Sequence, residues 1–346
     1  MIIVAIFVTI ACLLQVGFSQ WVWIDHGKPP LYTGLRHMTS KRKVFGLGNG
    51  RPRELYWDSS HWLWVTYWNS SVLWKSEFIA SEPCALQGGR LFAISSIGRL
   101  FELHGTGKLN DPWTWEIHGE AMGNIRIQTT SCTCTTKTSV SRIFVIGMNG
   151  KIYERYWSRR DNKWAWRDHG IPHATLFIKA IDSYNLSSYD TFIFVIGGNN
   201  ALYYRHITSE NADIASWVSI GSPSGEGILS LVTSSPMGIF IATSNNNICE
   251  YRSVSRKWFC YGKIPGTSLA ISRAYKVIDT PEFHNRGRIV FVYNWEPWNK
   301  IGRLFSLQIT PSRTYSWTNH GYLVKLYYTC THDTCNEIYD RKTVKV

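Results

Sequence analysis

A five-residue motif recurs along the chain and constrains its fold more than any other feature. The motif, called the Trp motif below, consists of a Trp, two variable residues, a ring or an Ile, and a Gly. Its six copies end at Gly27, Gly119, Gly170, Gly221, Gly262 and Gly321, and a degraded seventh copy runs from Trp74 to Phe78. Most intervals are about 40 to 50 residues, which is the length of one four-stranded propeller blade. A ring of such repeats forms one continuous body, so the repeat predicts a single domain.

Each Trp motif is preceded by an apolar run, a turn and a second β-rich run. The clearest example is residues 143–146, then Asn149 and Gly150, then residues 152–154. Asn-Gly between two such runs predicts a β-hairpin with a type I′ turn. The same turn position holds residues that adopt positive φ at low cost, namely Gly50, Gly98, Asn200 and Asn246. No segment has a sustained helical period, so we expect an all-β chain whose repeats each contain an inner strand, a central hairpin and an outer strand.

The chain ends decide the predicted number of blades. Residues 21–27 form an outer strand with no hairpin before it, and residues 325–341 form a hairpin with no Trp motif after it. Pairing the two ends would close the ring and cover its edge strands. We therefore expect a β-propeller of seven four-stranded blades closed by the N- and C-terminal strands. The alternative is six blades and an irregular seventh, because residues 321–325 are too few for an inner strand.

The N-terminal residues 1–19 are apolar and uncharged and end in small residues, which is typical of a secretory signal peptide. We expect one propeller domain over residues 20–346. No later stretch is apolar over the roughly 18 residues that a spanning helix needs, so we expect no transmembrane anchor and an extracellular protein. Two triplets beginning at Asn69 and Asn185 would then accept N-glycans.

Seven cysteines remain after the signal peptide, and the odd number leaves at least one outside an intramolecular disulfide. Cys249 and Cys260 lie on successive predicted strands and are expected to pair, as are Cys330 and Cys335 across a tight turn. Cys84 could join either Cys132 or Cys134, and the sequence leaves that choice open. No second Cys or His pair stands at zinc spacing, so we predict no metal site and no cofactor.

The formal net charge of +13 lies entirely on the mature chain. A basic extracellular protein tends to meet acidic surfaces, such as sulfated or sialylated glycans, glycoproteins and matrix polymers, or anionic lipid. Nucleic acid is a poor fit for a secreted protein. The alternative is that the excess charge only keeps the protein soluble.

A recurrent pair of charged residues marks the candidate binding sites. Arg42, Arg90 and Arg142 precede the first hairpin strand, and Glu54, Glu102 and Glu154 end the second, each twelve residues later. Trp57 and Trp157 follow the Glu, and Trp115 and Trp166 lie on the next strand. Arginine, carboxylate and an aromatic face together suit a sugar, which presents both hydroxyl groups and an apolar C–H side. The alternative is that Arg and Glu only pair with each other and hold the hairpin together.

This pattern of Arg, eleven residues, Glu and then aromatics resembles the blades of fungal fucose-specific lectins. Residues 143–170 are also similar to PLL-like and tectonin-type lectin propellers. The resemblance implies sites between adjacent blades in which Arg and Glu hold fucose, and it implies multivalent binding in which weak sites add through avidity. Blades four to six depart from the pattern, which leaves at most three or four intact sites.

Enzymatic functions fit the sequence less well. Sialidases share the propeller shape, but the chain has no Ser-x-Asp-x-Gly-x-x-Trp box and no distinct carboxylate pair for acid and base. The recurrent His26, His118, His169 and His320 share one repeat position, which favours a hydrogen-bonding role at the blade end over catalysis. We therefore predict a secreted carbohydrate-binding protein that is not an enzyme. The rival prediction is a secreted scaffold that binds other proteins without sugar specificity.

Overall fold

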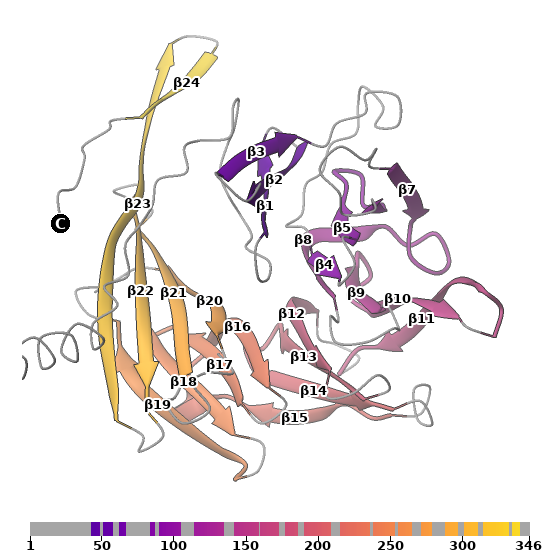
Figure 1. Ribbon diagram of the computed structural model, residues 1–346. Helices are drawn as coiled ribbons and strands as arrows, with labels where there is room; N and C mark the ends of the chain where they lie inside the picture. The colour runs from indigo at the N-terminus through magenta and orange to yellow at the C-terminus, as the bar shows by residue number, and fades with distance from the viewer. Residues whose placement is uncertain are drawn as a thin grey trace, which may run out of the picture.

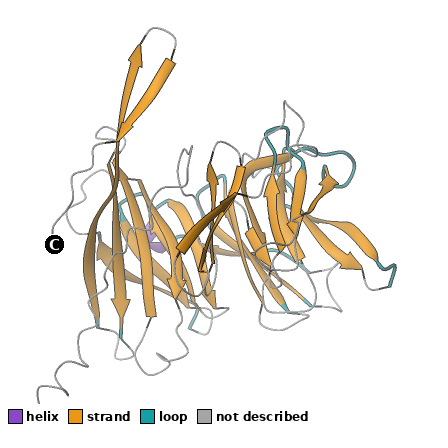
Figure 2. Cartoon of the chain, turned by 45° about the horizontal axis from the view of Figure 1, so that its top comes forward, coloured by secondary structure: helices purple, strands orange, loops and turns teal. Residues whose placement is uncertain are grey.

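The computed structural model describes 18 segments of the chain. They are residues 43–48, 51–57, 62–66, 84–86, 90–104, 114–134, 142–158, 160–172, 177–185, 190–208, 215–235, 238–252, 255–264, 271–278, 288–296, 301–310, 314–331 and 334–339. Within them the structure is all-β, as predicted, and the single helical element is the short 3-10 helix η1 (Pro223–Gly225) (Figure 2).

The described strands form six antiparallel sheets, here called blades one to six. Blade one contains β1 (Lys43–Gly48), β2 (Arg51–Trp57) and β3 (Trp62–Thr66), and blade two contains β4 (Cys84–Leu86), β5 (Arg90–Ile94), β6 (Leu100–His104) and β7 (Thr114–Gly119). Blade three contains β8 (Ile127–Cys134), β9 (Arg142–Gly147), β10 (Ile152–Ser158) and β11 (Lys163–Gly170), and blade four contains β12 (Ile178–Asn185), β13 (Thr191–Gly197), β14 (Leu202–Ile207) and β15 (Val218–Gly221). Blade five contains β16 (Ile228–Ser235), β17 (Gly238–Thr243), β18 (Asn247–Arg252) and β19 (Lys257–Lys263). Blade six contains β20 (Ile271–Ile278), β21 (Arg288–Glu296), β22 (Ile301–Ile309), β23 (Tyr315–Thr331) and β24 (Thr334–Tyr339).

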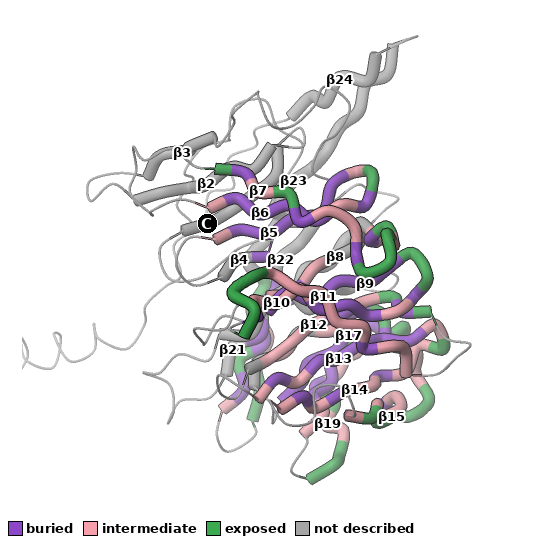
Figure 3. Tube along the Cα trace, turned by 90° about the vertical axis from the view of Figure 1, so that its right-hand side faces the viewer, coloured by how far each residue is buried: buried purple, intermediate pink, exposed green. Residues whose placement is uncertain are grey.

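The blades follow one another in chain order around a common centre, with β4, β8, β12, β16 and β20 innermost (Figure 1). Buried residues concentrate on the strands and exposed ones on the turns (Figure 3). The hydrophobic core lies between blades: Phe92 and Leu100 of blade two pack with Ile143 and Val145 of blade three. Corresponding clusters join blades three to four, four to five and five to six. Flat sheets that bury their faces against their neighbours explain the apolar run in every repeat.

The central hairpins have the predicted residues but not the predicted turn type. A type I′ turn needs positive φ at both middle residues, whereas here only the last turn residue has it, at Gly98, Gly150, Asn200 and Asn246. In each turn the N–H of that residue donates to the carbonyl three residues earlier, as Gly150 does to Gly147 at 2.9 Å. The loop is therefore one residue longer than a type I′ hairpin, and the type I′ prediction was wrong.

The Gly of the Trp motif also has a conformational reason. Gly119, Gly170, Gly221 and Gly262 all have positive φ, between 67° and 81°. At the end of β7 the register shifts, so that Gly119 faces Leu100 while Ile117 faces Phe101. Such a bulge places an extra residue in the outer strand and needs a left-handed backbone position, which glycine adopts without steric cost.

The chain ends leave the predicted ring closure untested. Residues 1–19 and 21–27, and Asn69, lie outside the described residues, so the signal peptide, the first strand and that glycan acceptor stay predictions. The C-terminal hairpin forms as predicted, but β23 is one continuous 17-residue strand that pairs with β22 up to Lys325 and then extends beyond it to pair with β24. The stretch that is too short for an inner strand is therefore the middle of this long strand. No helix within the described residues is long and apolar enough to cross a membrane.

Within the described residues there are two disulfides, Cys84–Cys134 between blades two and three and Cys249–Cys260 within blade five. The prediction that Cys249 pairs with Cys260 is confirmed. The sequence left the partner of Cys84 open between Cys132 and Cys134, and in the structure it is Cys134. The backbones of Cys330 and Cys335 pair across the terminal hairpin, but their side chains lie outside the described part, so that disulfide stays a prediction. The side chain of Asn185, at the end of β12, is likewise not described.

Candidate functional site: the junction of blades two and three

The Arg90–Glu102 pair lies where blade two meets blade three. In the β5–β6 hairpin Glu102 faces Phe92. Arg90 lies two residues before Phe92 on β5, so Arg90 and Glu102 are diagonal neighbours on one face of the sheet. Arg90 Nε contacts Glu102 Oε1. The Glu102 side chain is fully buried, whereas that of Arg90 keeps 31% of its surface exposed. The Glu102 carboxylate is thus enclosed by the protein, whereas the Arg90 side chain is partly exposed to solvent.

His118 of the Trp motif connects this pair to the next blade. Its Nε2 is 2.8 Å from Glu102 Oε2, and its Nδ1 is 3.3 Å from Arg155 Nε of β10. Arginine can only donate, so Nδ1 accepts and Nε2 carries the proton that is donated to Glu102. Burial lowers the pKa of Arg155, and the negative charges of Glu116 and Glu102 act in the opposite direction. The result is a polar chain that runs from Arg90 through the buried carboxylate to Arg155.

Aromatic side chains, called the aromatic wall below, lie beside this series of polar groups; they are Trp157, Trp164 and Trp166. Trp164 of β11 packs its ring 5.9 Å from Phe92, 4.9 Å from His118 and 5.7 Å from Trp157, all edge to face. The Arg90 guanidinium lies 5.4 Å from the centre of the same indole. These distances are within the range of cation–π contacts and aromatic pairs. The half-buried Trp164 therefore unites a cation from blade two with the aromatic residues of blade three.

A second cation lies against this wall. The Arg155 guanidinium is 5.9 Å from the centre of Trp164 and 5.2 Å from the centre of Trp166. Trp164 and Trp166 alternate with one residue between them, so both rings leave the same face of β11. The junction thus combines two guanidinium groups with three half-buried indoles, Trp157 being the third.

Three ligand-type side chains gather at the junction, with atoms of Glu102, Glu116 and His118 within 4.8 Å of one another. Both nitrogens of His118 are already used, and Glu102 faces Arg90 and His118. Their contacts account for the gathering, so we assign no metal to it. Glu116 is half-buried and adds a carboxylate to the site.

The corresponding pair of blade three is closed. Glu154 is fully buried, Arg142 keeps 8% of its side chain exposed, and their Nε and Oε1 atoms are 3.4 Å apart. His169 Nε2 is 2.9 Å from Glu154 Oε2, and Arg167 lies 3.3 Å from the same oxygen. Burial by itself raises the pKa of Glu154, but the His169 hydrogen bond and the charges of Arg142 and Arg167 outweigh it and leave this pKa lowered.

Blade four closes over this second pair. Arg142 reaches Thr191 Oγ1 at 3.5 Å, while Arg205 Nη1 and Trp217 Nε1 donate to the His169 carbonyl at 2.6 and 3.0 Å. At this junction Arg142 and Glu154 pair with each other inside the protein, and their role in ligand binding stays a prediction.

The buried Glu and the ring of the Trp motif occur together. In blade five Glu250 is also fully buried, and it accepts a hydrogen bond from Tyr261 at 2.6 Å and pairs with Arg252 at 2.9 Å. In blade four Tyr204 replaces the Glu and Ile220 replaces the ring. The expectation that the recurrent His residues bond at the blade end is confirmed for His118 and His169. Their partner is the buried Glu, which ties the outer strand to the central hairpin.

The remaining predicted site residues fall into two groups. Trp115 is buried, with its ring 6.2 Å from Phe101, and so belongs to the core. Arg42 lies outside the described residues, and Glu54 and Trp57 are described by backbone alone, on β2 with Glu54 opposite Phe45. Their role in ligand binding stays a prediction.

Sequence reasoning missed Trp164 and Arg155. A Trp-x-Trp spacing could have revealed Trp164, since alternate residues of a strand share a face. In blade four the equivalent position, two residues before Trp217, is Ala215. The Trp-x-Trp spacing therefore also distinguishes the junction of blades two and three from that of blades three and four. Arg155 follows the predicted Glu154 directly and points to the other blade, which no local pattern indicates.

The comparisons with known proteins support the architecture. No protein-family profile matches the sequence, and no curated protein matches it either. Among solved structures, the WD40 domain of SCAP from fission yeast is similar at a TM-score of 0.50 and 9% identity, over 86% of this chain and 71% of that one. The chain is a β-propeller. The BP39L lectin from Burkholderia pseudomallei has a TM-score of 0.49 and 15% identity, over 82% of this propeller and 80% of the lectin. The SapL1 lectin, solved with alpha methyl fucoside, has 0.46 and 14%, over 81% and 91%.

Proposed function

We propose that this propeller binds carbohydrate at the junction of blades two and three and is not an enzyme. The observation that carries the proposal is the partly exposed Arg90 side chain, whose guanidinium lies beside the Trp164 indole, with Arg155 on the same aromatic wall. Guanidinium N–H groups donate to vicinal hydroxyls, and an indole covers the apolar C–H side of a pyranose ring. Glu116 offers a carboxylate acceptor. Fucose-type glycans are the ligands that the resemblance in sequence implies.

The proposal narrows the prediction of several equivalent sites. The Arg142–Glu154 pair is buried beneath blade four, so a ligand could reach it only if that junction opened. We therefore expect one main site among the described junctions, and binding of moderate strength without the avidity of a multivalent lectin. Secretion stays part of the proposal, because residues 1–19 lie outside the described part of the chain.

A glycan array probed with the purified full-length chain tests the proposal. Arg90→Ala and Trp164→Ala should each weaken binding to the recognised glycan by about 10-fold or more, since a hydrogen bond to a charged group is worth roughly 1.5–3 kcal/mol. Arg126→Ala is the matched control, because this exposed arginine lies at the opposite end of the blades. Silence across the array, or binding that both site variants leave intact, would contradict the proposal.

A protein-binding scaffold is the second candidate, and exposed apolar side chains favour it. Met148 is 65% exposed and Phe177 58%, and Met122, Leu229 and Ile97 are exposed as well. These residues lie on the central turns or near the start of the next blade, which share one end of a propeller. Apolar side chains gathered at one end suit a protein partner. Pull-down of a protein that Met148→Ser and Phe177→Ser abolish, with no glycan bound, would favour this candidate.

A further inference from the structure

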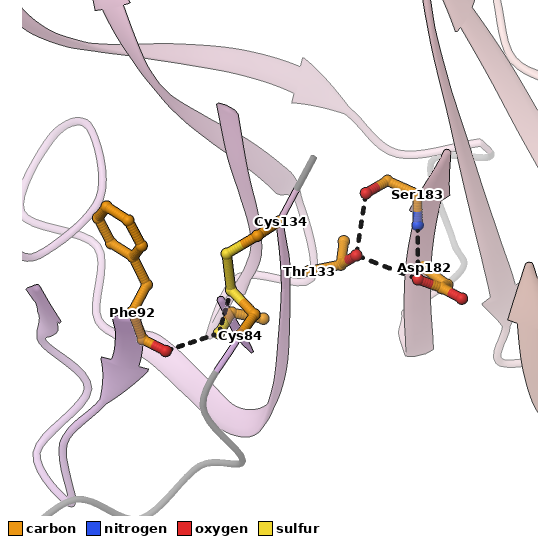
Figure 4. The surroundings of a disulfide bond; sticks show 7 residues. Cys84, Phe92, Thr133, Cys134, Asp182 and Ser183 are labelled. Carbon is orange, nitrogen blue, oxygen red and sulfur yellow. Dashed lines mark hydrogen bonds between the residues drawn. A yellow bond between two sulfur atoms is a disulfide. The ribbon is translucent and has the colours of Figure 1, made fainter. Parts of the chain in front are cut away.

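Three cysteines from two neighbouring blades lie together near the centre of the propeller. Cys84 begins β4, the inner strand of blade two, and Cys132 and Cys134 end β8, the inner strand of blade three. Cys84 is bonded to Cys134 (Figure 4). Cys132 keeps its thiol, and its Sγ is 3.0 Å from the Sγ of Cys84. The Cys132 thiol thus donates a hydrogen bond to one sulfur of the disulfide.

The geometry of β8 explains why both cysteines reach the same partner. Cys132 faces Val145 and Cys134 faces Ile143 on β9, so they are alternate residues of one strand and their side chains leave the same face. Cys84 faces Phe92 on β5, the neighbouring strand of blade two, and Cys132 Sγ is also 3.5 Å from the carbonyl oxygen of Phe92. The sulfur of Cys84 therefore has one cysteine bonded to it and a second within contact distance.

We propose that Cys84, Cys132 and Cys134 form a thiol–disulfide exchange site in which Cys84 is the shared partner. The Cys132 thiol loses its proton, and the resulting thiolate attacks Cys84 Sγ. A bond forms between Cys132 and Cys84, the bond between Cys84 and Cys134 breaks, and Cys134 leaves as a thiolate that takes up a proton. One disulfide and one thiol exist before and after the step, so it consumes no oxidant or reductant.

The exchange leaves the architecture intact while it moves the thiol. Either disulfide joins β4 to β8 and so ties blade two to blade three. The thiol shifts by two residues along β8, between two half-buried positions. Among the cysteines whose side chains the structure describes, Cys132 is the one thiol, and it contacts Cys84. The Cys249–Cys260 disulfide therefore has no described thiol beside it. That disulfide is a built-in control.

Mass spectrometry of the oxidised full-length protein tests the proposal. The protein is held at about pH 8, quenched with acid so that exchange stops, and alkylated with N-ethylmaleimide in denaturant before digestion with trypsin without reduction. Residues 127–137 form one tryptic peptide with Thr133 between the two cysteines, so its fragment ions show which cysteine carries the label. We expect label at both Cys132 and Cys134, with the minor isomer above about a tenth because the two bonds join the same strands. Cys249–Cys260 should show one connectivity.

Two further measurements separate exchange from a mixture fixed during folding. Each isomer, once separated by chromatography, should regenerate the other within hours at pH 8. The variant Cys134→Ser should form a Cys84–Cys132 disulfide, and Cys132→Ser should retain Cys84–Cys134 alone. Label confined to Cys132 in the wild-type protein overturns the proposal, as do separated isomers that do not interconvert. If Cys134→Ser fails to fold, the wild-type label distribution and the isomer experiment still decide the question.

Discussion

Glu154, a residue predicted to meet a ligand, is enclosed by charged side chains of the protein itself. Its carboxylate is fully buried among Arg142, Arg167 and His169. Removing one partner of a buried ionic group leaves the other charges uncompensated, which is costly. A pattern of charges twelve residues apart cannot reveal this burial, because the neighbouring blade supplies it.

The variant Glu154→Gln should therefore lose about 3 kcal/mol of unfolding free energy at pH 7. The folded pKa of Glu154 lies below its ordinary value of 4.5, so its contribution is fully present above that value and is lost as the pH falls through the folded pKa. The gap between wild type and variant should narrow below pH 4.5. Urea unfolding at pH 7 and at a series of acidic pH values measures it. Glu120→Gln, at a half-buried position, is the control, and a gap that is constant with pH would refute the assignment.

Tyr261 makes a comparable contribution in blade five with a neutral donor. Its hydroxyl donates to buried Glu250 at 2.6 Å, and burial together with this hydrogen bond raises the pKa of Tyr261 to about 12. Tyr261→Phe should lower stability by about 2 kcal/mol, because the carboxylate keeps Arg252 but loses its second partner. Thermal or urea unfolding checks this, with the exposed Tyr315→Phe as the control. Equal losses in the two variants would show that the hydroxyl of Tyr261 is not special.

Within a strand or hairpin, the sequence predicts conformation well. The Trp motif, the apolar run and the turn residues are all local, and the structure places them in the expected order of inner strand, hairpin and outer strand. The turn type was missed because Asn149 and Gly150 were assigned the two middle positions, whereas Gly150 is the residue that follows them. Trp164 was missed because the Trp motif of blade three was defined as beginning at Trp166, two residues later.

Gly221 offers a clean test of the conformational role of the motif. Its φ is 81°, and a Cβ built on it would meet no atom within 4 Å. Any loss in Gly221→Ala is therefore backbone strain, expected to be about 1 kcal/mol. Gly221→Asn should lose less, because Asn adopts left-handed conformations more readily. Chemical denaturation of the three proteins checks the order, and an Asn variant as unstable as the Ala variant would contradict it.

At the scale of the whole molecule, contacts between blades decide which sites are open, and these contacts are what the sequence does not contain. Arg90 and Arg142 have the same spacing to their Glu, yet the side chain of Arg90 is 31% exposed and that of Arg142 is buried. The difference comes from the following blade, where Trp164 stands beside Arg90 and Thr191 contacts Arg142. The repeat predicts the ring of blades, and only the packed ring distinguishes the partly exposed Arg90–Glu102 pair from the buried Arg142–Glu154 pair.

The two disulfides differ in whether they join two blades, and their removal should change the stability of the propeller by different amounts. Cys84–Cys134 spans 50 residues and joins two blades, whereas Cys249–Cys260 spans 11 residues within one blade. In the chain-entropy account the longer loop restricts the unfolded state more, so replacing Cys84, Cys132 and Cys134 by Ser should cost about 1 kcal/mol more than replacing Cys249 and Cys260. Urea unfolding of both variants against wild type measures the difference. A larger loss from the blade-five pair would mean that local strand pairing, rather than the tie between blades, limits the stability of the propeller.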